Sequence, residues 1–76
     1  MTLEILTPDK SLFNGEVESV LLPGSSGTFE ILNNHAPIVA RLKAGTLKVR
    51  SKEGNQNFEI KGGIVEMLDN KIVVLA

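Results

Sequence analysis

The sequence predicts an all-β domain. Its apolar residues recur with a period of two rather than 3.6, the spacing of strands with one buried face. Valine, isoleucine and leucine supply most of the hydrophobic fraction of 42%, and branched aliphatic side chains favour strands. No segment carries a helical stripe. About eight short strands, separated by turn signals, are typical of a β-sandwich or a small barrel.

The length of 76 residues predicts one domain, residues 1–76, near the lower size at which a hydrophobic core alone holds a fold. The mean hydropathy of +0.10 excludes the disordered class. No linker, internal repeat or low-complexity tract divides the chain. We therefore expect a single core of modest stability.

In the first half of the chain, Leu3 and Ile5 alternate with polar residues and predict an inward-facing strand. The run from Glu16 to Leu22 is also apolar, but its apolar residues change from an odd position, Val17, to even positions, Val20 and Leu22. A β-bulge near Glu18-Ser19 would reconcile the two registers. Residues 23–27, rich in glycine and serine, then read as a surface loop.

In the second half, Ala44-Gly45 predicts a turn, and the segment after it has the cleanest alternation in the chain, with Leu47 and Val49 inward. Residues 52–55 predict a hairpin loop. Gly62-Gly63 permits a sharp bend or a close backbone approach.

The last two predicted strands are joined by Asp69-Asn70, a candidate two-residue hairpin. The final strand, Lys71–Leu75, is continuously apolar after its first residue. Such a run predicts a central strand that is covered on both faces.

No pattern for catalysis, a cofactor or a metal site is present. The chain has no cysteine, which excludes disulfides and thiolate chemistry, and its single histidine, His35, lacks metal-ligand spacing. Ser25 and Ser26 lie in a glycine-containing loop that leads into neither a nucleophile elbow nor a phosphate-binding helix. We therefore expect a protein that is not an enzyme and holds no cofactor.

Nucleic-acid binding and membrane insertion are disfavoured. The net charge is −1 with scattered basic residues, and Phe13, Phe29 and Phe58 fall where core residues are expected rather than on a stacking surface. No apolar run approaches the roughly 20 residues that span a bilayer. A stand-alone β-domain that binds a small ligand or single-stranded nucleic acid remains the alternative to a protein-binding module.

An ordered set of motifs covers essentially the whole chain. It consists of FNGEVESVLLPGSSGTFEILNNHAP at 13–37, LKAGTLKV at 42–49, GGIVE at 62–66 and IVVLA at 72–76. Each piece is weak alone, but the ordered set is specific. It resembles the N-terminal domain of the epsilon subunit of the F-type ATP synthase.

The resemblance implies a flattened β-sandwich of about ten short strands at the foot of the central stalk. It implies a non-catalytic rotor subunit that couples the c-ring to the gamma subunit during proton-driven ATP synthesis. The partners would be gamma and the c-ring, with no nucleic acid and no direct membrane insertion. The subunit would be peripheral, on the cytoplasmic face of the bacterial inner membrane.

The resemblance also assigns contact residues. The loop expected to meet the c-ring carries Thr28 where many relatives have glutamate, which implies a less charged contact. The expected c-ring contacts are Gly24, Ser25, Ser26, Gly27 and Thr28, and the expected gamma contacts are Thr7, His35 and Ala40.

Most members of the family continue past the last strand into a two-helix hairpin that restrains ATP hydrolysis. This sequence stops at Ala76. We therefore expect no C-terminal helical hairpin in this polypeptide, whether it is a naturally short member or a chain divided at the domain boundary.

Overall fold

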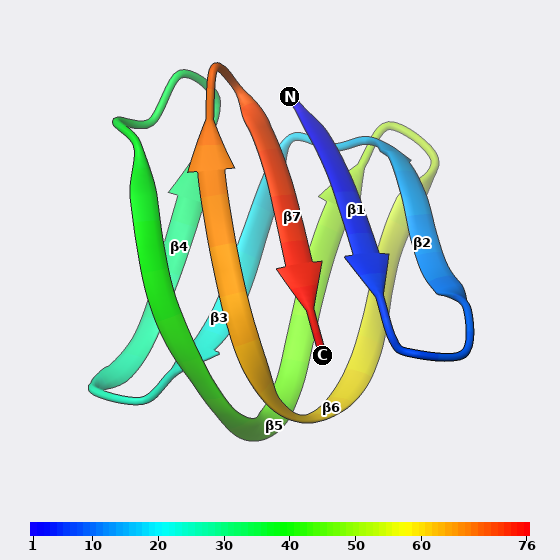
Figure 1. Ribbon diagram of the computed structural model, residues 1–76. Coiled ribbons are helices and arrows are strands. Elements are labelled where there is room, and N and C mark those ends of the chain that lie inside the picture. Colours follow the sequence, from blue (N-terminus) through cyan, green and yellow to red (C-terminus); the bar gives the residue numbers. More distant parts are fainter.

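The computed structural model describes all 76 residues and contains seven β-strands (Figure 1). The chain forms no helix, and so none that is long and apolar enough to span a membrane. The strands are β1 (Thr2–Leu6), β2 (Ser11–Glu16), β3 (Ser19–Gly24), β4 (Gly27–Leu32), β5 (Ile38–Ser51), β6 (Gly54–Leu68) and β7 (Lys71–Leu75).

The strands form one hydrogen-bonded sheet in the order β2-β1-β7-β6-β5-β3-β4. All neighbours are antiparallel except β1 and β7, which run parallel. Because β5 and β6 bend together, the sheet folds over itself into two layers (Figure 1). The first layer contains β2, β1, β7, the end of β6 and the start of β5. The second layer contains β4, β3, the end of β5 and the start of β6.

This arrangement confirms the predicted β-sandwich, but the expected number of strands was wrong. The structure has seven strands rather than ten, since β5 and β6 are 14 and 15 residues long and each serves both layers. The turn predicted at Ala44-Gly45 was also wrong. Both residues lie within β5, where a side chain at Gly45 would stand 2.9 Å from Pro23.

The bend predicted at Gly62-Gly63 is confirmed, and it depends on glycine. Gly62 and Gly63 have φ values of 137° and 142°, which side-chain-bearing residues rarely adopt. A Cβ at Gly63 would lie 2.1 Å from the carbonyl oxygen of Leu75 in β7. The inward alternation also changes across the bend. In β5, Leu42 is buried before it and Leu47 after it.

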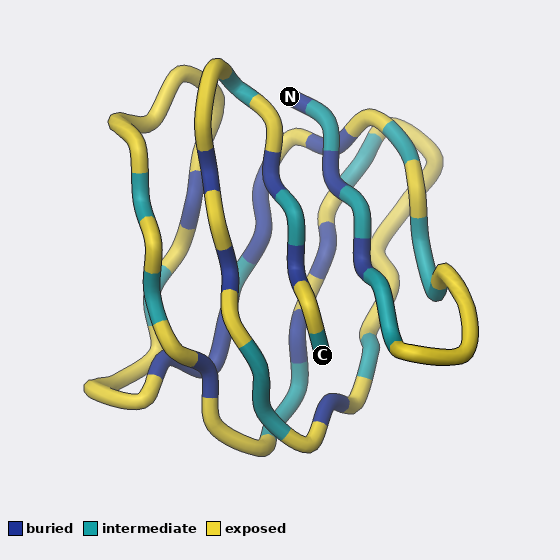
Figure 2. The backbone as a smooth tube through the Cα atoms, in the orientation of Figure 1, coloured by how far each residue is buried: buried dark blue, intermediate teal, exposed yellow.

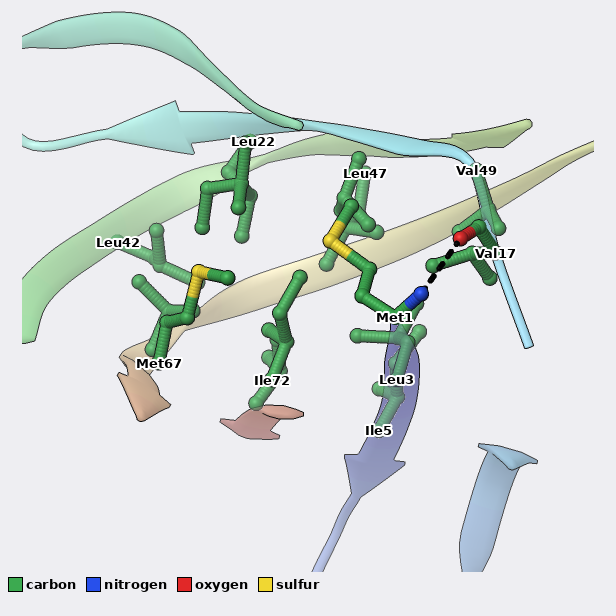
Figure 3. Close-up of a cluster of buried hydrophobic side chains, with 14 of the residues drawn as sticks. Met1, Leu3, Ile5, Val17, Leu22, Leu42, Leu47, Val49, Met67 and Ile72 are labelled. Atoms are coloured by element: carbon green, nitrogen blue, oxygen red, sulfur yellow. Dashed lines mark hydrogen bonds between the residues drawn. The ribbon is translucent and has the colours of Figure 1, made fainter. Parts of the chain in front are cut away.

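The core lies between the two layers, where fifteen hydrophobic residues are buried (Figures 2 and 3). The predicted inward residues are confirmed: Leu3, Ile5 and Leu47 are fully buried, and Val49 is 2% exposed. Every buried side-chain nitrogen and oxygen has a hydrogen-bond partner. The fifteen core residues are leucine, isoleucine and valine together with two methionines, so the core contains no aromatic ring.

The continuous strand predicted from Glu16 to Leu22, with a bulge, was wrong. β2 ends at Glu16 and β3 begins at Ser19. Between them, the backbone N–H of Val17 donates to Met1, and that of Glu18 donates to Arg50. The shift in register that suggested a bulge is thus a break between two strands that lie in different layers.

The prediction that β7 is covered on both faces was also wrong. β7 lies between β1 and β6, as expected of a central strand, and Ile72 and Val74 are buried. On its other face, however, Val73 is only half-buried and Leu75 is 54% exposed. The sandwich has only two layers, so nothing covers the outer face of the first.

The three phenylalanines are half-buried at the margin of the core rather than within it. Phe13 and Phe58 meet edge to face, with ring centroids 5.7 Å apart. Their rings come from β2 and β6 and pack against the aliphatic cluster.

The two predicted hairpins are confirmed. Asp69 and Asn70 have φ values of 51° and 61°, as a two-residue type I′ turn requires. In the other hairpin, Ser51 pairs with Gly54 across the turn.

Replacing Gly63 by alanine should destabilise the domain by about 3 kcal/mol or more, since the new methyl group would collide with the backbone of β7. Gly54→Ala is the matched control. Gly54 also has a positive φ, of 120°, but a Cβ there meets open space, so only about 1–2 kcal/mol of backbone strain is expected. Urea unfolding followed by circular dichroism measures both. Equal losses would show that the bend tolerates a side chain.

Val49→Asp should unfold the domain, because the carboxylate would enter the core without a partner at a cost of several kcal/mol. The neighbouring change Lys48→Asp places the same residue on the exposed face and should leave the cooperative unfolding transition intact. Thermal unfolding of the two variants makes the comparison. A cooperatively folded Val49→Asp variant would contradict the assigned inward face of β5.

Candidate partner-binding surfaces

The predicted loop of residues 24–28 is a tight hairpin turn rather than a flexible loop. Gly24 pairs with Gly27, which leaves Ser25 and Ser26 as the two turn residues. A Cβ at Gly24 would lie 2.5 Å from the Gly27 carbonyl oxygen, so the strands meet closely at this point. The N–H of Ser25 donates to the carbonyl of Arg41 at 2.9 Å. The turn is thus anchored to β5 while residues 25–28 are exposed.

His35 lies in the loop between β4 and β5, at the opposite end of the sandwich from the β3–β4 turn (Figure 1). Its side chain is exposed, and Nδ1 is 2.7 Å from the carbonyl oxygen of Ala36. The backbone N–H of His35 donates to Leu32 at 3.2 Å. The residues predicted to contact gamma and the c-ring through these two loops therefore stand at separate ends.

The structure does not bring Thr7, His35 and Ala40 together. Thr7 lies in the β1–β2 connection, at the same end as the β3–β4 turn, and its hydroxyl bonds the backbone of Lys10 at 3.1 Å (Figure 1). Ala40 is half-buried and packs against the core. Their roles as contact residues stay predictions, although the local structure already uses the Thr7 hydroxyl and the Ala40 methyl group.

A surface that the sequence analysis missed lies on the outside of the first layer. We call it the outer apolar face. It consists of four aliphatic side chains with exposed fractions between 46% and 75%: Val39, Ile64, Leu68 and Leu75.

The strand register makes these four residues neighbours. Ile64 lies directly opposite Leu75, and Val39 is paired with Glu66, which places Val39 diagonal to Ile64 and Leu68. The continuous apolar run of β7 was the signal in the sequence. It was interpreted as coverage on both faces, whereas it marks one buried face and one open face.

Charged residues lie both within and around the outer apolar face. Glu66 stands in its middle, between Val39 on β5 and Val73 on β7 and between Ile64 and Leu68 along β6. At its edges, Arg41 is paired with Ile64, and Glu4 with Val73. A mixture of apolar and charged side chains is a common composition of protein–protein contact surfaces.

The chain brings together no group of three or more histidine, cysteine, aspartate or glutamate residues that could hold a metal ion. Its surface hollows are shallow and open. One is lined by Gly24, Phe29 and Ala40 beside the β3–β4 turn, and another by Pro37, Val39 and Leu68 beside the outer apolar face. The two features of the surface that stand out are therefore the β3–β4 turn and the outer apolar face.

These features define a small β-sandwich whose prominent surfaces suit contact with other macromolecules. Residues 1–76 match the model of the family described as ATP synthase, Delta/Epsilon chain, beta-sandwich domain. The chain belongs to this family.

The curated relatives carry the name ATP synthase epsilon chain. That of Leptospira borgpetersenii serovar Hardjo-bovis (strain JB197) is 43% identical over 75 residues, which cover 99% of this chain and 59% of the relative. That of Chlorobaculum tepidum is 43% identical over 75 residues, covering 97% of this chain and 85% of the relative. The chain thus spans less than two thirds of the Leptospira protein but most of the Chlorobaculum protein.

Two solved structures share the fold. A chain of the Euglena gracilis mitochondrial ATP synthase (OSCP/F1/c-ring) superimposes with a TM-score of 0.89 at 22% identity, over 97% of this chain and 48% of that chain. A chain of the Tetrahymena thermophila mitochondrial ATP synthase (central stalk/c-ring) gives 0.83 at 22% identity, over 97% and 60%. At these identities the likeness supports the two-layer fold.

Proposed function

We propose that this chain is a non-catalytic rotor component of the central stalk of an F-type ATP synthase. It would couple the c-ring to the gamma subunit during proton-driven ATP synthesis. The observation that carries the proposal is the match of the whole chain, residues 1–76, to the epsilon-chain β-sandwich family. The two separate exposed surfaces support a coupling role, which requires one surface for each partner.

Gamma would bind the outer apolar face together with the loop that carries His35. Val39, Ile64 and Leu75 stay exposed in the isolated domain, and their burial would supply a hydrophobic driving force. Arg41 at the margin of the face and Glu66 in its middle would select the register of the contact. This revises the predicted gamma surface, because the side chain of Ala40 packs inward.

The c-ring would contact the exposed residues of the β3–β4 turn, Ser25 to Thr28, while Gly24 is buried and would only shape the turn. The turn projects from one end of the sandwich, and its anchor on Arg41 keeps it in a defined position (Figure 1). No residue of the turn is charged, so the contact would depend on backbone and hydroxyl groups more than on ion pairs.

In this role the chain transmits torque through its contacts, and we assign no chemical step to any of its side chains. The expected location is peripheral, at the cytoplasmic face of a bacterial inner membrane. Two observations support it: the family, and the names of bacterial relatives such as that of Leptospira.

Mixing the chain with purified gamma at micromolar concentration and moderate salt should give a complex on size-exclusion chromatography. Failure to form one would contradict the proposed function. The alternative, a stand-alone domain for a small ligand or single-stranded nucleic acid, would be indicated by a thermal shift with nucleotides or oligonucleotides in the absence of gamma binding.

Ile64→Glu should weaken gamma binding about tenfold or more, because it replaces the aliphatic side chain opposite Leu75 by a second carboxylate beside Glu66. Leu21→Glu is the control. Leu21 is half-buried on β3 in the second layer, where it is paired with Glu30 and Lys48 and lies away from the His35 loop. Isothermal titration calorimetry gives the two affinities, and circular dichroism checks the fold. Equal effects of the two changes would exclude the outer apolar face as the binding surface.

A further inference from the structure

The loop of residues 33–37 connects β4 in the second layer to β5 in the first, so it crosses between the layers without a strand partner (Figure 1). All five of its residues are exposed. Asn34 adopts a left-handed conformation, with φ of 63°. Such a segment needs hydrogen bonds from elsewhere if it is to hold one conformation.

Two groups from distant parts of the sequence supply such bonds: the N-terminal ammonium group of Met1, which donates to Oδ1 of Asn33 at 2.8 Å, and the side chain of Asn70. The backbone N–H of Asn34 donates to Oδ1 of Asn70 at 2.8 Å, and Nδ2 of Asn70 is 3.4 Å from Oδ1 of Asn33. The contact between Asn34 and Asn70 joins residues 36 positions apart. The Asn70 amide group therefore serves as both acceptor and donor to the crossing loop.

The backbone of Asn70 is itself fixed by the fold. It is the second residue of the two-residue β6–β7 turn, and its carbonyl accepts a hydrogen bond from the N–H of Thr2 at 3.2 Å. The other turn residue, Asp69, has a similar φ but is exposed and takes no part in the bonds to the loop. The side chain of Asn70 is thus the specific link between this hairpin and the loop.

The same link joins the two parts of the surface proposed for gamma. The β6–β7 turn directly follows Leu68 of the outer apolar face. At the other end of the crossing loop, Pro37 lines a shallow hollow together with Val39 and Leu68. Fixing the loop against the hairpin therefore fixes His35 relative to the apolar side chains.

We infer that Asn70 is a positioning residue for the gamma interface: it holds the His35 loop beside the outer apolar face before gamma arrives. The inference rests on the proposed function. A loop that is already ordered loses less conformational freedom on binding, so the benefit appears as affinity for the partner. Asn70 itself need not touch gamma.

Three variants of the β6–β7 turn test this. Asn70→Gly removes the amide but accepts the left-handed backbone, whereas Asp69→Gly makes the same kind of change at the neighbouring position. Asn70→Asp keeps an oxygen to accept the Asn34 N–H. We expect Asn70→Gly to weaken gamma binding about three- to tenfold and to speed hydrogen exchange of the Asn34 amide. Asp69→Gly should leave both at wild-type values, and Asn70→Asp should restore the slow exchange.

The measurements are calorimetric titration with gamma and amide exchange by NMR, together with unfolding curves for every variant. Wild-type gamma affinity in Asn70→Gly, despite fast exchange at Asn34, would overturn the inference and leave the proposed function standing. Equal losses of affinity in Asn70→Gly and Asp69→Gly would also overturn it, as an effect of the turn alone. Absence of gamma binding by the wild-type chain would instead overturn the proposed function, and the inference with it.

Discussion

The double bend in β5 and β6 is the constraint on which the rest of the structure depends. One hydrogen-bonded sheet becomes two layers only because these long strands turn together, and the aliphatic core forms in the space between the layers. Gly63 makes the bend possible by lying against the carbonyl oxygen of Leu75, where no side chain would fit. The close contact also fixes β7 beside β6. Backbone conformation at one corner therefore determines both the layers and the position of the last strand.

A domain of two layers has two outer faces, and they differ in this protein. The first layer leaves Val39, Ile64, Leu68 and Leu75 open to solvent, although the domain is small enough that burying more apolar area would stabilise it. Exposed aliphatic side chains that gather on one sheet face, with Glu66 among them, are better explained by a partner than by stability. In the proposed function this partner is gamma, while the β3–β4 turn at the end of the sandwich remains free for the c-ring.

The loops at the two ends are ordered by different means. At one end, β3 and β4 pair up to Gly24 and Gly27, so the turn is ordered by the sheet itself and by the bond from Ser25 to Arg41. At the other end, the crossing loop has no strand partner and is held by the Asn70 side chain and by the N-terminal ammonium group of Met1. A surface that is ordered before binding is suited to a rotor component, because torque passes through a contact only if the contact does not yield.

The sequence by itself determined the all-β class, the inward residues of β1 and of the second half of β5, and the hairpins at Asp69-Asn70 and residues 52–55, because these depend on local alternation and turn chemistry. Its ordered motifs also identified the family. Only the tertiary structure decided that Ala44-Gly45 continues a strand, that β7 is open on one face, that Ala40 points inward, and that Asn70 reaches the His35 loop. Each of these depends on which segments meet across the fold, and the alternation of apolar and polar residues along the chain does not specify which segments meet.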